Sequence, residues 1–177
     1  MPGGQRLRCV RPGSPTAGDT AWGIRQQPTG AANHRIGQSW CVEPTDVLSP
    51  DFDDAERRLL RWGAIEWGGP ARCTDEMAVA MGFQSVQDLF DSTDRLTDAI
   101  ESGTPLTAMD WLRILLATEI VFSSNTIGSG LDWSMTSGFT DEESLALLRS
   151  VQRKLPGIGN LIGVAFGTGY RRPSTFR

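Results

Sequence analysis

One stretch, residues 107–133, constrains the fold more than any other part of the chain. It reads TAMDWLRILLATEIVFSSNTIGSGLDW, and its first half is the most apolar run in the sequence. Thr107 is a suitable N-cap with Asp110 three residues later, and apolar side chains then recur around most of the helix circumference. Because such a helix must be surrounded by other elements, residues 107–122 are predicted to form the axis of the core.

A carboxylate, Glu119, interrupts this apolar run. It lies four residues after Leu115 and three before Phe122, which places it on an apolar face of the predicted helix. Burial penalises its charge, so Glu119 needs a partner or a functional role. We interpret Glu119 as a paired structural charge, with a binding or catalytic role as the alternative.

The segment that follows, residues 123–138, is predicted to be a loop. It reads SSNTIGSGLDWSMTSG, which is rich in Ser, Thr and Gly and lacks the alternation of a strand. Long loops in a compact domain carry function more often than short connectors do. Asp132 and Trp133 are its most distinctive residues and are binding candidates. The alternative is that Trp133 fills the edge of the core, with its indole N–H bonded locally.

Four further helices are predicted from caps and hydrophobic periodicity. They are expected near residues 51–67, 74–82, 85–103 and 140–155. Ser, Thr or acidic residues precede them, and Gly or Pro follows them. No segment has a convincing strand pattern. The sequence therefore predicts an all-α fold, an irregular bundle of about five helices, because the connections differ in length.

The chain is predicted to divide into three parts. Residues 1–48 are rich in Pro, Gly and Arg without regular periodicity, which predicts a disordered or loosely docked arm. Residues 49–156 form the predicted helical domain. Residues 157–177 are Gly-rich, apolar and basic, and predict a flexible tail whose apolar run is too short to span a bilayer. Membrane association through this tail is a minor alternative and is not favoured. No signal-peptide pattern is found near the N-terminus, so secretion by that route is not expected.

Few residues in the chain are suited to metal or nucleophilic chemistry. Its three cysteines, Cys9, Cys41 and Cys73, are far apart, and His34 is the only histidine. This composition predicts no disulfide framework, no metal site, no cofactor and no histidine-based catalysis, and it is typical of a cytoplasmic protein.

Charge is distributed unevenly along the chain. The formal net charge is −4 at pH 7, yet residues 51–155 carry nine basic and eighteen acidic side chains, a net charge of −9. The predicted helices at 74–82 and 85–103 have the spacing of a helix-turn-helix motif. Their acidity argues against a nucleic-acid partner, because DNA binding depends on neutralising phosphates.

An acidic stripe on the predicted helix 85–103 gives the leading functional hypothesis. Asp88, Asp91, Asp94 and Asp98 recur along one side of this helix. Complementary charge steers association between proteins and fixes their orientation. The sequence therefore favours a protein–protein interaction module, of an inhibitor, immunity or regulatory type, for a basic protein partner.

A second hypothesis is a small ligand-binding domain or a carboxylate-based hydrolase with a Trp-lined pocket. Paired carboxylates can act as general acid and base, and tryptophans can stack on a ligand. Their spacing matches no catalytic motif, so an enzyme is less favoured than a binding protein. A structural role within a larger assembly is the third hypothesis. The binding candidates are Glu66, Trp67, Asp110, Trp111, Glu119, Asp132 and Trp133.

Overall fold

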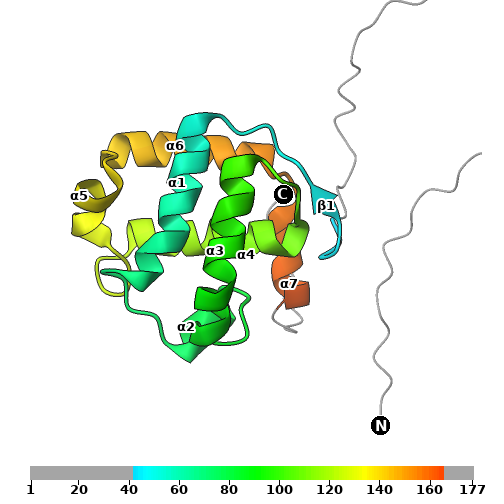
Figure 1. Ribbon diagram of the computed structural model, residues 1–177, viewed down its shortest axis with the longest axis horizontal. Helices are drawn as coiled ribbons and strands as arrows, with labels where there is room; N and C mark the ends of the chain where they lie inside the picture. The colour runs from blue at the N-terminus through cyan, green and yellow to red at the C-terminus, as the bar shows by residue number, and fades with distance from the viewer. Residues whose placement is uncertain (1–41, 166–177) are drawn as a thin grey trace, which may run out of the picture. The chain divides into compact units, whose positions relative to one another are not determined.

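The structure is a computed structural model, and it describes residues 42–165. Its regular structure is almost entirely helical (Figure 1), and the prediction of an all-α fold is confirmed. The α-helices are α1 (Asp54–Ile65), α2 (Asp75–Ala80), α3 (Val86–Ser102), α4 (Ala108–Ser123), α5 (Trp133–Ser137), α6 (Asp141–Lys154) and α7 (Ile162–Ala165). Short 3-10 helices, named η1 (Glu66–Gly68), η2 (Gly130–Asp132) and η3 (Ile158–Leu161), adjoin them. Residues 1–41 and 166–177, which make up most of the two predicted tails, lie outside the described residues.

Side-chain caps define where the long helices begin. Each capping oxygen accepts a hydrogen bond from a backbone N–H of the first turn, which has no partner inside the helix. At the start of α6, the reciprocal bond from Thr140 N–H to Glu143 completes a capping box, as predicted. The capping residues are Asp53, Thr74, Ser85, Thr107 and Thr140 for α1, α2, α3, α4 and α6, respectively.

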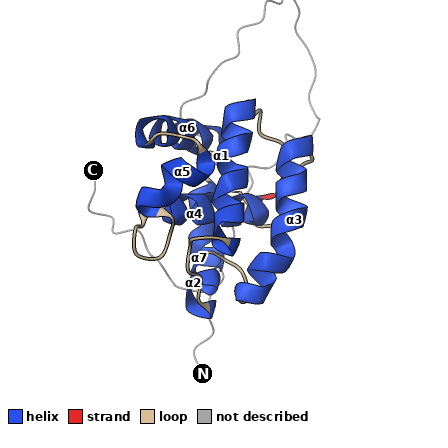
Figure 2. Cartoon of the chain, turned by 60° about the vertical axis from the view of Figure 1, so that its left-hand side comes forward, coloured by secondary structure: helices blue, strands red, loops and turns tan. Residues whose placement is uncertain are grey.

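The core is built around two helices rather than one. α4 is enclosed as predicted, because nine of its residues are buried on more than one side. α1 is equally central, since it packs against α3, α4 and α6 (Figure 2). The predicted axis of the core is therefore shared between α4 and α1.

α1 and α4 approach each other closely at Gly63. A Cβ atom added to Gly63 would lie 2.1 Å from Thr118 Oγ1 and 2.8 Å from Thr118 Cα. Thr118 is fully buried, and its hydroxyl donates a hydrogen bond to Ile114 O at 2.8 Å. No side chain larger than hydrogen fits at Gly63 without moving the two backbones apart.

The predicted loop at residues 123–138 is only partly a loop. η2 and α5 occupy its second half, and Trp133 at the start of α5 is fully buried. The hydroxyls of Thr136 and Ser137 donate to Trp133 O at 3.2 and 2.6 Å. A polar segment can therefore be helical here, because its hydroxyls bond within the turn and one tryptophan supplies the packing.

The domain extends beyond the predicted bounds of 49–156 at both ends. Residues 42–48 are part of it, because β1 (Val47–Leu48) pairs antiparallel with β2 (Leu106–Thr107). After residue 156, η3 and α7 continue the helical structure, and Ile158 and Leu161 are buried. Residues 158–161, which were predicted to belong to a flexible tail, form a 3-10 helix with two buried side chains. Ile158 and Leu161 are its buried apolar side chains, and the glycines around them obscure this pattern in the sequence.

No helix within residues 42–165 combines the length and the apolarity needed to cross a membrane.

Replacing Gly63 by Ala is expected to lower the free energy of unfolding by about 2 kcal/mol or more. The added methyl group overlaps Thr118, and this overpacking outweighs the better helix propensity of alanine. Urea denaturation followed by circular dichroism measures the change. Gly68→Ala is the matched control, because nothing lies within 4 Å of its added Cβ. Equal stability of the Gly63→Ala protein and the control would contradict the close crossing.

Candidate functional site

The three candidate tryptophans are core residues. Trp67, Trp111 and Trp133 are 2%, 3% and 0% exposed. Their indole N–H groups donate to Ala117 O at 3.3 Å, Leu48 O at 3.2 Å and Ser144 Oγ at 2.8 Å, respectively. Buried indoles with bonded N–H groups cannot offer a stacking surface to a ligand. Trp133 fills the core, and Trp111 borders a cavity of about 10 Å³, which is too small for a ligand.

Two of the candidate carboxylates make contacts that tie parts of the fold together. Glu66 is 3% exposed and accepts a hydrogen bond from the Ser129 hydroxyl, which joins η1 to the loop after α4. Glu119 is half-buried and accepts a hydrogen bond from Gln152 Nε2 at 2.7 Å. Gln152 in turn accepts from Arg149 Nη1 at 2.7 Å, so the Gln152 amide lies between Glu119 and the Arg149 cation. Another candidate carboxylate, Asp132, is exposed.

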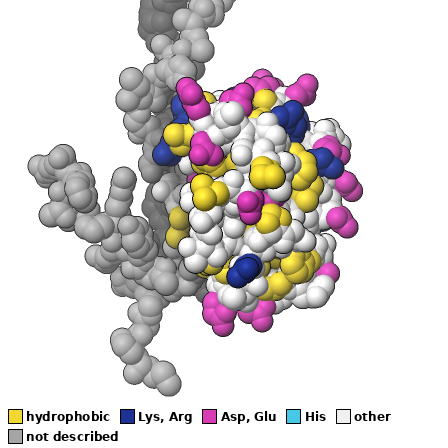
Figure 3. Space-filling view, turned by 90° about the vertical axis from the view of Figure 1, so that its left-hand side faces the viewer, with side chains coloured by type: hydrophobic (Ala, Val, Ile, Leu, Met, Phe, Trp, Pro, Cys, Tyr) yellow, Lys and Arg dark blue, Asp and Glu magenta, His cyan; other side chains and the backbone are white. Residues whose placement is uncertain are grey.

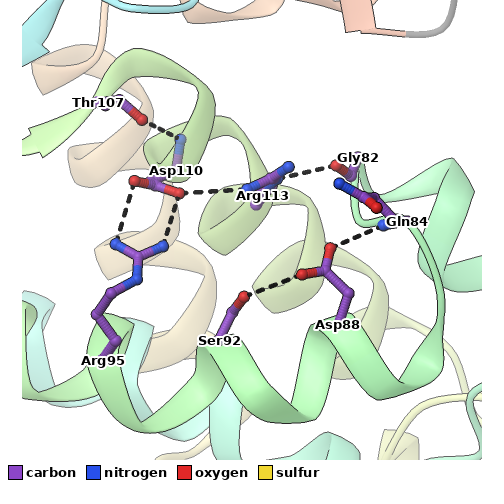
Figure 4. Close-up of polar contacts among 8 residues, drawn as sticks. All are labelled: Gly82, Gln84, Asp88, Ser92, Arg95, Thr107, Asp110 and Arg113. Atoms are coloured by element: carbon purple, nitrogen blue, oxygen red, sulfur yellow. Dashed lines mark hydrogen bonds and ion pairs between the residues drawn. The ribbon is translucent and has the colours of Figure 1, made fainter.

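Asp110 is the most strongly bonded of the candidates (Figure 4). Its carboxylate accepts from Arg95 Nη1 and Nη2 at 3.3 and 3.1 Å, and from Arg113 Nη1 at 3.4 Å. Arg113 also donates from Nε to Gly82 O at 2.8 Å. This network connects the start of α4 to α3 and to the turn after α2. Asp110 is thus committed to holding the helices together.

The network lowers the pKa of Asp110. Burial raises that pKa, but the hydrogen bonds from Arg95 and Thr107 and the charges of Arg95 and Arg113 lower it by more. The folded-state pKa therefore lies below the unfolded-state value of about 3.9. Ionised Asp110 stabilises the fold above that pH, and this contribution is lost as the pH falls through the folded-state pKa.

A second ion pair, between the buried Glu56 and the partly exposed Lys154, was not predicted. Glu56 is 1% exposed, and its Oε2 accepts from Lys154 Nζ at 2.6 Å and from Asp53 N–H at 2.8 Å. Burial raises the pKa of Glu56, and the contacts with Lys154, Ser150 and Asp53 lower it by more. The spacing of Asp53 and Glu56 is a local signal for the capping contact between them. No local pattern indicates that Glu56 also pairs with Lys154, at the end of α6.

The predicted acidic stripe on α3 divides into two parts. Asp88 is half-buried in the first turn of α3, and its carboxylate accepts a hydrogen bond from Gln84 N–H at 2.8 Å (Figure 4). Asp91, Asp94 and Asp98 are exposed, and none of them has an ion pair within the described residues. Their spacing places them along one side of the helix. These three carboxylates are termed the α3 acidic face.

An open groove lies where the end of α4, η2 and the start of α6 meet. Its volume is about 560 Å³, and none of the candidate residues lines it. The side of the domain that carries α5 displays several hydrophobic side chains with acidic groups among them (Figure 3). Half of the lining residues belong to the segment at residues 123–138, whose length and composition were the sequence signal for a functional region here. The lining residues are Phe122, Ser123, Asn125, Gly130, Leu131, Asp141, Glu142 and Leu145.

Comparison with protein families, curated proteins and solved structures finds no match to this chain. Among the described residues, no group of three or more His, Cys, Asp and Glu side chains is placed to hold a metal ion. His34, Cys9 and Cys41 lie outside that part of the chain. Two surfaces within residues 42–165, the α3 acidic face and the groove, are therefore the candidate functional sites.

Replacing Asp110 by Asn is expected to lower the free energy of unfolding at pH 7 by about 1–2 kcal/mol. The change removes charge-assisted hydrogen bonds, whose value is reduced because Arg95 is partly exposed. The difference from the native protein should shrink as the pH falls below about 4, where the carboxylate becomes protonated. Urea titrations at several pH values measure it.

Asp94→Asn is the matched control for this change, because Asp94 is exposed and has no ion pair among the described residues. A difference between the Asp110→Asn and native proteins that stayed constant down to pH of about 2 would contradict an electrostatic role.

Proposed function

We propose that residues 42–165 form a protein-interaction module whose α3 acidic face binds a basic polypeptide. The observation that carries this proposal is the exposure of three carboxylates, Asp91, Asp94 and Asp98, with no ion pair among the described residues. They repeat along one side of α3, so a single partner segment can contact all three.

The distribution of cations supports the proposal. Residues 42–165 carry twenty acidic and nine basic side chains, a net charge of −11. Several of the basic side chains are already engaged: Arg95 and Arg113 with Asp110, Arg61 with Glu101, and Lys154 with Glu56. The remaining negative charge at the surface attracts basic partners, and this attraction speeds association at low salt. An inhibitor, immunity-type or regulatory protein would use a surface of this kind.

The same contacts favour an interaction module over the alternative of a ligand-binding domain or hydrolase. Glu66 and Asp110 hold elements of the fold together, and the three candidate tryptophans fill the core. A hydrolase needs its acid and base free to contact a substrate. The carboxylates free to meet a partner are those on the surface.

Changing Asp91, Asp94 and Asp98 together to Asn is expected to weaken binding of a lysine-rich peptide about tenfold. Each exposed ion pair contributes about 0.2–1 kcal/mol, so three lost pairs account for a change of this size. Fluorescence anisotropy of the labelled peptide, measured at two salt concentrations, gives the affinity. The salt dependence should also become weaker in the variant.

The matched control changes three exposed acids elsewhere, Glu43→Gln, Asp51→Asn and Glu76→Gln, so that both proteins gain the same net charge. The control is expected to bind within about threefold of the native protein, because screening weakens distant charges. Equal loss in the two proteins would mean that net charge alone attracts the peptide. That result, or no loss in either, would reject the proposal.

A further inference from the structure

The geometry points to a second recognition surface: we infer that the groove beside α5 binds an amphipathic helix of a partner protein, with apolar residues on one side and Lys or Arg at its flanks. The groove shares no residue with the α3 acidic face. Binding at the groove therefore does not depend on the function proposed for α3, and each surface can be tested separately.

Large apolar side chains are exposed at the groove and next to it. Leu131, Met135 and Leu145 are 80%, 85% and 47% exposed. Leu131 and Leu145 both line the groove, and Met135 follows Leu131 by one helical turn on the same side of η2 and α5. Clustered exposed apolar side chains mark interaction sites, because they cost solubility and contribute little to the fold.

The fold holds these side chains outward. Trp133 lies between Leu131 and Met135 in the sequence, is fully buried, and contacts the Phe122 ring edge-on at a centroid distance of 5.9 Å. Residues two positions away on a helix point to roughly the opposite side. Leu131 and Met135 therefore cannot turn into the core unless Trp133 leaves it and loses its bond to Ser144.

The loop that forms one wall of the groove is fixed in place. A Cβ atom added to Gly128 would lie 2.4 Å from Val121 O, so the loop lies directly against α4. Ser129 N–H donates to Val121 O at 2.9 Å, and Leu131 N–H donates to Asn125 Oδ1 at 3.1 Å. A preformed groove loses little conformational entropy when a partner binds, which favours affinity.

Charge and shape select the kind of partner. Asp141 and Glu142 line the groove, are exposed, and have no ion pair within residues 42–165, so they favour a basic occupant. The groove is open, and a small apolar ligand would leave much of its surface in water. A helix can cover the exposed apolar residues and place Lys or Arg beside the two carboxylates.

The test uses the full chain and a synthetic helical peptide of about five turns, with Leu at the i, i+3, i+4 and i+7 positions and Lys at the flanks. Fluorescence anisotropy of the labelled peptide should show binding, and a peptide with Glu in place of Lys should bind at least about tenfold more weakly. The variant Leu131→Ser with Met135→Ser should lose about tenfold in affinity, because it removes apolar contacts.

Two controls separate this surface from the rest of the molecule. Val47→Ser with Val79→Ser removes exposed apolar side chains, 67% and 48% exposed, that do not line the groove, and should leave binding unchanged. The α3 variant of Asp91, Asp94 and Asp98 should retain most of its affinity for this peptide. Because Leu131 and Met135 are so exposed, their replacement should leave the unfolding midpoint in urea unchanged.

Several results would overturn the inference. Equal binding of the Lys and Glu peptides, or an unaffected Leu131→Ser, Met135→Ser protein, would exclude the groove as a site for a basic helix. A native protein that sediments as a dimer and a variant that sediments as a monomer would assign the groove to a second copy of the chain. Peptide binding only after removal of residues 166–177 would assign it to this chain's own C-terminal segment.

Discussion

The close crossing of α1 and α4 at Gly63 is the contact on which the rest of the structure depends. It sets the end of α1 beside α4, where η1 continues the chain. There, Trp67 donates to Ala117 O in α4, and Glu66 accepts from Ser129 in the loop that follows α4. The loop is thus placed by the same packing that closes the core. If the helices moved apart, the wall of the groove would lose its support.

The acidic groups of the domain fall into two sets, those that are buried and paired with cations and those that are exposed. Asp110 and Glu56 are buried, paired with cations and held ionised by those cations, so they contribute stability at neutral pH. Because these pairs engage several of the few cations, the acidic groups at the surface, such as Asp94 and Glu142, remain without ion pairs among the described residues. The internal electrostatics of the fold therefore produce the acidic surface that a basic partner would recognise.

Local signals in the sequence predicted most of the helices. Contacts between segments that are distant in the sequence could not be predicted. The predicted starts of α3, α4 and α6 agree with the structure. Each start depends on a capping side chain and a backbone N–H only three residues later in the sequence. The role of Gly63 depends on Thr118, fifty-five positions away, and the ion pair of Glu56 depends on Lys154. The groove combines three segments, so no single stretch carries its pattern.

The most direct measurement is a map of backbone amide chemical shifts in the full chain as a lysine-rich amphipathic peptide is added. We expect the changes to concentrate along α3 near residues 91–98 and around residues 131–145, while the interior of α1 and α4 is unaffected, because both surfaces are preformed. Small changes spread evenly over every acidic segment of the domain would contradict this expectation, since they would show attraction by net charge without a recognition surface.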